Sequence, residues 1–150
     1  MKAGDKAPDF ELPDETGTMR KLSDFLASGP VVLFFYPAAM TAGCTAESCH
    51  FRDLKSEFEK VGAQRIGISC DSVAKQKQFS DKYSFDYPLL SDESGDVARA
   101  FDVNRKYITP VKRATFVIGT DGKIISEIKS ELKMAVHADK ALEILGARAS

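Results

Sequence analysis

Cys44 and Cys49 are the residues of this sequence best suited to covalent chemistry, and Thr41 stands three positions before the first of them. A cysteine thiolate attacks electrophiles, and the sulfenic acid that it forms with a peroxide condenses with a second thiol to a disulfide. If Thr41 caps a helix, its hydroxyl accepts a hydrogen bond from a backbone N–H near Cys44, which then lies in the first helical turn. The free N–H groups of that turn favour an anion, so we expect Cys44 to ionise readily to a thiolate.

Ionisation alone gives Cys44 only limited reactivity. A free thiol is about 3% ionised at pH 7, so complete ionisation improves the nucleophile by roughly 30-fold, or ~2 kcal/mol. The remaining acceleration must come from donors that stabilise the oxygen leaving as the thiolate attacks a peroxide. The alternative is that Cys44 is simply a small buried residue near the start of a helix.

The spacing of the two cysteines prevents a disulfide between them inside an intact helix. Cys49 comes five positions after Cys44, which corresponds to about 140° of rotation and ~7.5 Å of rise. The two Cα atoms are then more than ~7 Å apart, beyond the reach of an unstrained bridge. Disulfide formation therefore requires the helix to unwind, and we expect the amides of residues 44–54 to lose protection from hydrogen exchange on oxidation.

The elements on either side of this site are a buried strand and an amphipathic helix. Residues 31–36 (VVLFFY) form an apolar run bounded by proline on both sides, which is typical of a buried strand. Ligands in α/β folds tend to bind at the carboxyl ends of strands, where the loop to Cys44 starts. Apolar residues then recur at spacings of three and four over residues 41–61, which predicts one helix ended by Gly62: Phe51, Leu54, Phe58 and Val61.

The rest of the chain alternates between predicted strands and helices. An Asp121-Gly122 turn between two β-branched runs predicts a tight hairpin. No repeat or linker divides the sequence, so we expect a single domain of residues 1–150, of α/β class, with a central mixed β-sheet flanked by helices. The expected strands are 64–70, 88–90, 114–119 and 124–128, and the expected helices are 71–83, 96–101 and 135–145, the last closed by Gly146.

Composition argues against several classes of protein. Lys and Arg number 21 against 22 for Asp and Glu, which leaves no field to attract nucleic acid or an anionic membrane. No apolar run approaches the ~20 residues that span a bilayer, and the polar N-terminus lacks a signal sequence, so we expect a cytoplasmic protein. Three cysteines are too few, and too odd a number, for a secreted disulfide framework.

Three ordered motifs resemble a known family. The segment Pro37-x-x-x-Thr41-x-x-Cys44 is similar to the active-site signature of peroxiredoxins, and Cys49 five residues later is similar to their Q-type branch, the bacterioferritin comigratory proteins. The resemblance implies a thioredoxin-like fold and a peroxidase that reduces hydrogen peroxide and organic hydroperoxides. Two further segments resemble the same family: Gly4-Asp5-x-Ala7-Pro8-Asp9-Phe10 and Arg113-x-Thr115-Phe116.

The resemblance also implies a role for each residue of the site. It makes Cys44 the peroxidatic cysteine and Cys49 the resolving cysteine, while Pro37, Thr41 and Arg113 complete the peroxide pocket. It further implies thioredoxin or a related dithiol protein as reductant, without cofactor or metal, and we expect a monomer or a weak dimer. The chain departs from the Q-type pattern at Ala42, which replaces a proline and should loosen the helix start, and at Cys70, an additional thiol.

Several residues have plainer interpretations. Taken alone, Arg113 is a surface charge before a strand. Glu47 either pairs with an arginine in the pocket or favours the helix N-terminus. Cys70 is expected to be a small buried residue rather than an alternative resolving thiol, and His137 is expected to be exposed on its helix. His50 suggests a general base or a metal ligand, but the spacings of ordinary zinc sites are absent from the sequence.

Two other functions use the same cysteines. A thiol-disulfide oxidoreductase is disfavoured, because four residues separate the cysteines where CxxC has two. A redox-sensing protein would expose a partner surface when the helix unwinds. A third alternative is nucleic-acid binding by residues 104–113, which hold four basic residues and one tyrosine, but the near-neutral net charge gives it little support.

Overall fold

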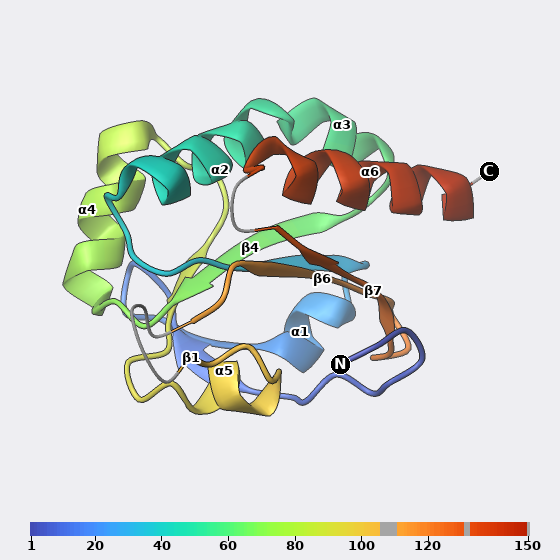
Figure 1. Ribbon diagram of the computed structural model, residues 1–150, viewed down its shortest axis with the longest axis horizontal. Coiled ribbons are helices and arrows are strands. Elements are labelled where there is room, and N and C mark those ends of the chain that lie inside the picture. The colour runs from blue at the N-terminus through green and yellow to red at the C-terminus, as the bar shows by residue number, and fades with distance from the viewer. Residues whose placement is uncertain (106–110, 131–132, 150) are drawn as a thin grey trace.

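The computed structural model describes residues 1–105, 111–130 and 133–149, and a five-stranded sheet lies at its centre (Figure 1). Two parallel pairs, β3 with β4 and β4 with β5, are joined to an antiparallel hairpin of β6 and β7 through the antiparallel pair β3 and β6. This mixed sheet with helices on both faces confirms the predicted α/β class. The strands in spatial order are β5 (Leu89–Ser91), β4 (Gln64–Ser69), β3 (Val31–Phe35), β6 (Ala114–Ile118) and β7 (Ile124–Lys129).

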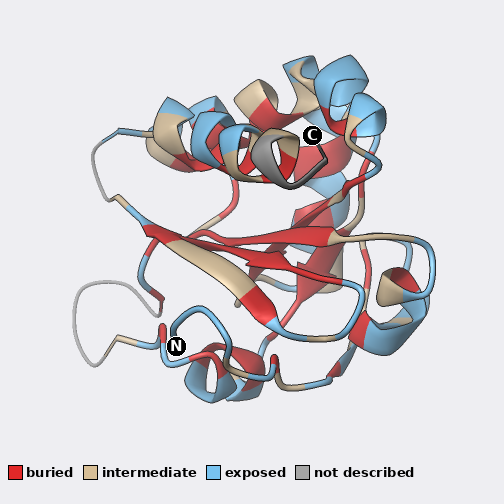
Figure 2. Cartoon of the chain, turned by 90° about the vertical axis from the view of Figure 1, so that its right-hand side faces the viewer, coloured by how far each residue is buried: buried red, intermediate tan, exposed pale blue. Residues whose placement is uncertain are grey.

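Alternate side chains of β3 enter two separate apolar layers, one on each face of the sheet. All five residues of the strand are buried, because helices cover both faces. Leu33 and Phe35 belong to the layer that includes residues of α1 (Leu22–Leu26) and α5 (Asp96–Ala100), and Phe34 belongs to the other. Figure 2 shows that the helices bury the sides turned to the sheet and expose their outer sides.

The helix that carries the two cysteines ends earlier than predicted. The sequence predicted one continuous helix, but the structure has α2 (Ala42–Asp53) and α3 (Lys55–Lys60), separated by Leu54 at φ −96° and ψ 21°. The carbonyl of Phe51 accepts a hydrogen bond from Arg65 Nη1 at 2.9 Å, so a side chain from β4 competes for a backbone acceptor just before the break. This contact comes from a distant part of the chain and leaves no local sequence pattern.

Two more helices lie on the same face of the sheet as α2 and α3. Helix α4 (Val73–Tyr83) begins after Ser72, whose hydroxyl accepts from the backbone N–H of Lys75 at 3.2 Å. Helix α6 (Ala135–Ala149) continues past Gly146, so the predicted end is wrong. A glycine ends a helix when its φ becomes positive, and Gly146 is not among the residues with positive φ.

The N-terminal part of the chain forms a small hairpin that the sequence did not reveal. It consists of β1 (Glu11–Pro13) and β2 (Met19–Lys21). The connecting turn is organised by the Asp14 carboxylate, which accepts from the backbone N–H groups of Thr16 and Thr18 at 2.9 and 3.1 Å. Three-residue strands are too short to show the alternating pattern on which strand prediction depends.

The sheet register brings three segments to one edge. Phe35 at the end of β3 pairs with Ala114 at the start of β6, and Ala114 pairs with Lys129 at the end of β7. The loop leaving β3, Arg113 and Ser130 therefore meet where α2 begins. Within the described ranges, no helix is both long enough and apolar enough to span a bilayer.

Candidate active site

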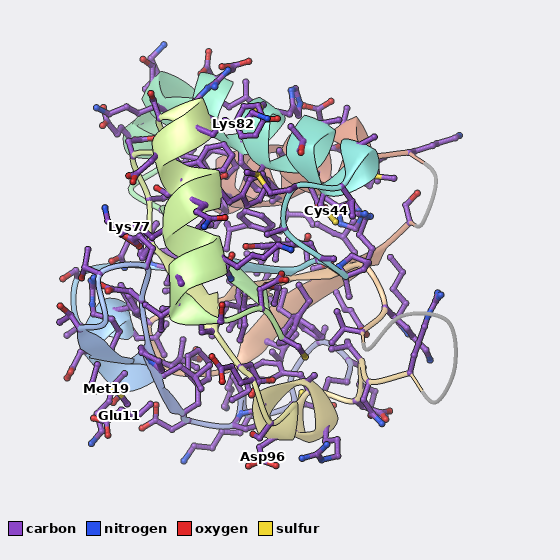
Figure 3. All side chains as sticks on the ribbon, turned by 90° about the vertical axis from the view of Figure 1, so that its left-hand side faces the viewer. Glu11, Met19, Cys44, Lys77, Lys82 and Asp96 are labelled. Carbon is purple, nitrogen blue, oxygen red and sulfur yellow. The ribbon has the colours of Figure 1, made fainter. Side chains whose placement is uncertain are left out.

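Cys44 is the third residue of α2, and its side chain is fully buried between that helix and the sheet (Figure 3). Thr41 occupies the predicted N-cap position, with extended backbone angles. The predicted capping hydrogen bond is wrong, because the Thr41 hydroxyl instead donates to the carbonyl of Ala38 at 2.8 Å. The Thr41 side chain therefore does not occupy the N–H groups of the first helical turn.

Arg113 is the residue that meets the sulfur. Its Nη2 lies 3.1 Å from Cys44 Sγ, and its Nη1 donates to Glu47 Oε1 at 2.6 Å. Arg113 is only 6% exposed and Glu47 is fully buried. The interpretation of Arg113 as a surface charge is therefore wrong, and the predicted pairing of Glu47 with an arginine of the pocket is confirmed.

The environment of Arg113 keeps its charge in place. Burial by itself lowers the pKa of the guanidinium, but the charges of Glu47 and a Cys44 thiolate, together with their hydrogen bonds, raise it by more. Gly43 leaves room for the guanidinium, because a Cβ there would lie 3.3 Å from Arg113 Nη2 and 3.3 Å from Met134 Cε. Arg113 is thus a permanent cation between Cys44 and Glu47, two groups that carry negative charge when ionised.

Asp71 holds the loop that leads from β3 to Cys44. Its Oδ2 accepts from the backbone N–H of Ala39 at 2.7 Å and from the Ser69 hydroxyl at 2.7 Å. Ser69 in turn accepts from Gln76 Nε2 at 2.9 Å, and Tyr36 donates to Gln76 Oε1 at 2.5 Å. No motif in the sequence indicated this network, although Asp71 follows β4, a strand that runs parallel to β3 and so ends at the same edge of the sheet.

The half of α2 that follows Cys44 is tied to the rest of the fold. Tyr87 donates its hydroxyl hydrogen to the carbonyl of Ser48 at 2.7 Å, and the ring of Phe51 stacks on Phe34 with centroids 4.1 Å apart. Cys49 is half-buried within this part of the helix, and burial raises the pKa of its thiol, while the nearby charge of Arg52 lowers it by less. All three cysteines are free thiols.

His137 contradicts its expected exposure. Its ring is fully buried, with Nδ1 2.8 Å from Thr115 Oγ1 and Nε2 2.8 Å from the carbonyl oxygen of Ser130. A single histidine in an amphipathic pattern gave no signal for this, because three separate elements supply its surroundings.

The remaining candidates lie apart from the sulfur of Cys44 or have other partners. Cys70 is half-buried and packs against the apolar layer on the opposite face of the sheet from Cys44, in agreement with its expected packing role. His50 Nε2 lies 2.8 Å from Asp139 Oδ1, which joins α2 to α6. No group of three or more potential metal ligands occurs in the part of the chain that the structure describes.

The basic segment 104–113 falls partly outside the described residues, which omit 106–110. Within it, Arg113 points into the site and is engaged by Cys44 and Glu47. Arg113 is therefore not available as a surface contact for nucleic acid.

Comparison with known proteins shows the family of this chain. The model of the AhpC/TSA family matches residues 3–127. A putative peroxiredoxin of Mycobacterium tuberculosis is 60% identical over 150 residues, which cover 98% of this chain and 97% of that protein. Peroxiredoxin Bcp of Escherichia coli is 38% identical over 151 residues, with 97% and 96% covered.

The chain is a peroxiredoxin of the AhpC/TSA family. Among solved structures, peroxidoxin BcpB of M. tuberculosis superimposes with a TM-score of 0.96 at 59% identity, covering 100% of this chain and 99% of that one. The bacterioferritin comigratory protein of Xanthomonas campestris gives 0.86 at 35% identity, covering 94% and 92%. The peroxiredoxin fold and the Q-type relationship are both confirmed, and the protein is a thiol peroxidase.

Proposed function

We propose that Cys44 is the peroxidatic residue and that Cys49 resolves its sulfenic acid as an intramolecular disulfide. The observation that carries the proposal is the contact of 3.1 Å between Arg113 Nη2 and Cys44 Sγ in a fully buried site. A guanidinium so close stabilises a thiolate and then the oxygen that departs from the peroxide.

The proposed reaction has two steps at the cysteines, followed by reduction of the disulfide. The Cys44 thiolate attacks one oxygen of the hydroperoxide, the O–O bond breaks, and the other oxygen leaves as hydroxide or alkoxide and takes up a proton. The Cys49 thiolate then attacks the sulfur of the sulfenic acid, and hydroxide leaves and is protonated to water. The resulting disulfide is reduced by two electrons from an external dithiol.

We assign Pro37 and Thr41 to the peroxide pocket together with Arg113. Both lie in the loop between β3 and α2, the helix that carries Cys44, and Asp71 anchors that loop through Ala39. The Thr41 hydroxyl donates to Ala38 in the resting structure, so rotation about its side chain would be needed before it could donate to a peroxide oxygen.

Resolution requires the first turns of α2 to unwind. Both cysteines belong to one continuous helix, whose geometry keeps their Cα atoms more than ~7 Å apart. The anchors at Ser48 and Phe51 favour unwinding that stops near Cys49. Because burial raises the pKa of the Cys49 thiol in the folded helix, unwinding would also make this thiol a better nucleophile at neutral pH.

Thioredoxin or a similar dithiol protein is the proposed reductant, and the proposed setting is the cytoplasm, where thiols stay reduced. The structural work on the Xanthomonas relative concerns alkyl peroxide reduction. We propose organic hydroperoxides and hydrogen peroxide as the substrates of this chain. A monomer or a weak dimer is sufficient for the proposed mechanism, since both cysteines and Arg113 belong to one chain.

Rapid-mixing kinetics on three proteins test the proposal. Wild type should turn over peroxide with a dithiol reductant, and Cys44→Ser should lose all reaction. Cys49→Ser should keep the first oxidation of Cys44 but fail to form the disulfide. Full turnover by Cys44→Ser would refute the assignment of the peroxidatic cysteine, and an intramolecular disulfide in Cys49→Ser would refute that of the resolving one.

A further inference from the structure

His137 is a buried polar residue that the reaction as described above does not use. It lies in the first turn of α6 and is fully buried, on a helix whose other buried positions are apolar. Burying an imidazole among apolar groups is unfavourable unless its nitrogens have partners. Its partners come from three other elements: Thr115 of β6, Ser130 after β7, and Glu47 of α2.

The hydrogen bond to Ser130 fixes one proton of the ring. A backbone carbonyl can only accept, so Nε2 of His137 carries a hydrogen and donates it across 2.8 Å. The variable proton therefore belongs to Nδ1. That nitrogen faces the Thr115 hydroxyl at 2.8 Å and the second carboxylate oxygen of Glu47, Oε2, at 3.7 Å.

Glu47 connects this ring to the reactive sulfur. Its Oε2 is turned toward His137, and its Oε1 accepts from Arg113 at 2.6 Å. Arg113 reaches Cys44 Sγ with its other terminal nitrogen at 3.1 Å. Four consecutive buried groups thus run from His137 to Cys44, and Glu47, Arg113 and His137 are each at most 6% exposed.

We propose that His137 is a positioning residue for the peroxidatic cysteine, acting through Glu47 on Arg113. This inference rests on the proposed function of Cys44. Nδ1 of the ring lies 3.7 Å from one oxygen of the Glu47 carboxylate, within ion-pair distance, and the orientation of that carboxylate determines how Arg113 presents its two terminal nitrogens to the sulfur. The contact also joins the start of α6 to the first half of α2.

The charges along this row give His137 an electrostatic effect as well. When Cys44 ionises, the thiolate and Glu47 carry two negative charges against one positive charge on Arg113. A proton on Nδ1 would balance them in a site where water does not screen charge. The charged and titratable groups facing His137 include Glu47 from α2, with Arg113 before β6 and Cys44 behind it, whereas Thr115 and Ser130 contribute uncharged partners.

Two amide substitutions separate this role from simple packing. In His137→Asn the amide nitrogen lies near the position of Nδ1 and can still face Glu47, whereas in His137→Gln it lies near Nε2 and keeps the bond to Ser130. Both are made in a Cys49→Ser, Cys70→Ser background, where Cys44 is the one thiol left. Iodoacetamide alkylation of Cys44 is measured against pH, and its oxidation rate constant with hydrogen peroxide is measured at pH 7.

His137→Gln should move the midpoint of the alkylation profile upward by about one pH unit and slow oxidation by roughly 10-fold. His137→Asn should keep both the alkylation midpoint and the oxidation rate much closer to those of the protein with His137. In a Glu47→Gln background, His137→Gln should produce no further shift, because it acts through that carboxylate. Equal behaviour of Asn and Gln, or additive effects with Glu47→Gln, would overturn the proposal.

A measurement on unaltered His137 covers the case in which the variants do not fold. The nitrogen-15 NMR signal of His137 Nδ1 should change over the same pH range as Cys44 alkylation, and Cys44→Ser should abolish that step. A signal indifferent to Cys44 would refute the coupling. Since alkylation and NMR report on Cys44 and His137 without turnover, failure of this inference is distinguishable from failure of the peroxidase assignment, which Cys44→Ser tests by itself.

Discussion

Replacing Arg113 with lysine keeps the positive charge of the site but removes its geometry. The guanidinium holds Cys44 Sγ at 3.1 Å and Glu47 Oε1 at 2.6 Å with two different nitrogens. A single ammonium on a flexible stem cannot maintain both contacts. Loss of one hydrogen bond to a charged group costs about 1.5–3 kcal/mol, so Arg113→Lys should lower the rate constant of Cys44 oxidation by roughly 10- to 150-fold.

Arg113→Ala should affect stability as well as rate. Glu47 is fully buried, and removing one partner of a buried ion pair costs about 3–5 kcal/mol. The alanine variant should therefore lose stability of this order and at least about 10²-fold in oxidation rate. Adding Glu47→Gln removes the uncompensated charge, so the double variant should regain most of the stability but not the rate.

The assay must measure Cys44 oxidation directly. The chain has no tryptophan, so competition for hydrogen peroxide against a coloured haem peroxidase is a suitable readout, with urea unfolding followed by circular dichroism for stability. A wild-type rate constant of Cys44 oxidation in Arg113→Lys would show that charge alone activates the sulfur. Recovery of rate together with stability in the double variant would show that Arg113 acts only by holding the fold, and either result would refute the reasoning.

Three further predictions concern the surroundings of the site. Asp71→Asn should slow peroxide turnover several-fold and lower the free energy of unfolding by about 1 kcal/mol, because a neutral amide oxygen is a weaker acceptor for Ala39 N–H. An unchanged turnover rate would show that this loop anchor does not affect catalysis. Gly67→Ala should destabilise the fold by about 1–3 kcal/mol in urea unfolding, since a Cβ there would lie 2.8 Å from Leu89 Cδ2, and a variant as stable as wild type would contradict that clash. Burial, followed by the charges of Asp92 and Asp71, raises the pKa of Cys70 to about 11. Its stabilising contribution is then complete below the unfolded value of about 8.5 and is lost as pH rises through about 11, so Cys70→Ala should flatten the alkaline limb of a stability-against-pH curve; an identical limb in both proteins would show that other groups cause it.

Local patterns in the sequence were enough to locate Cys44. The apolar run that became β3, the helix after it and the Asp121-Gly122 hairpin all depend on neighbouring residues, because backbone preference and side-chain periodicity act over a few positions. The family motifs added the expected role of Arg113. Errors arose where distant groups intervene, as where Arg65 meets the carbonyl of Phe51 at the end of α2.

Tertiary structure decided which distant residues reach the sulfur. Arg113 lies 69 positions after Cys44, and only the antiparallel pairing of β3 with β6 brings it to the start of α2. The burial of His137 depends in the same way on Thr115, Ser130 and Glu47, which come from three other elements. Sequence by itself determined a thiol at a helix start, since that requires only local order. The charges that surround the thiol were set by the register of the sheet and the packing of α6 on α2, because buried ion pairs depend on distances in space rather than along the chain.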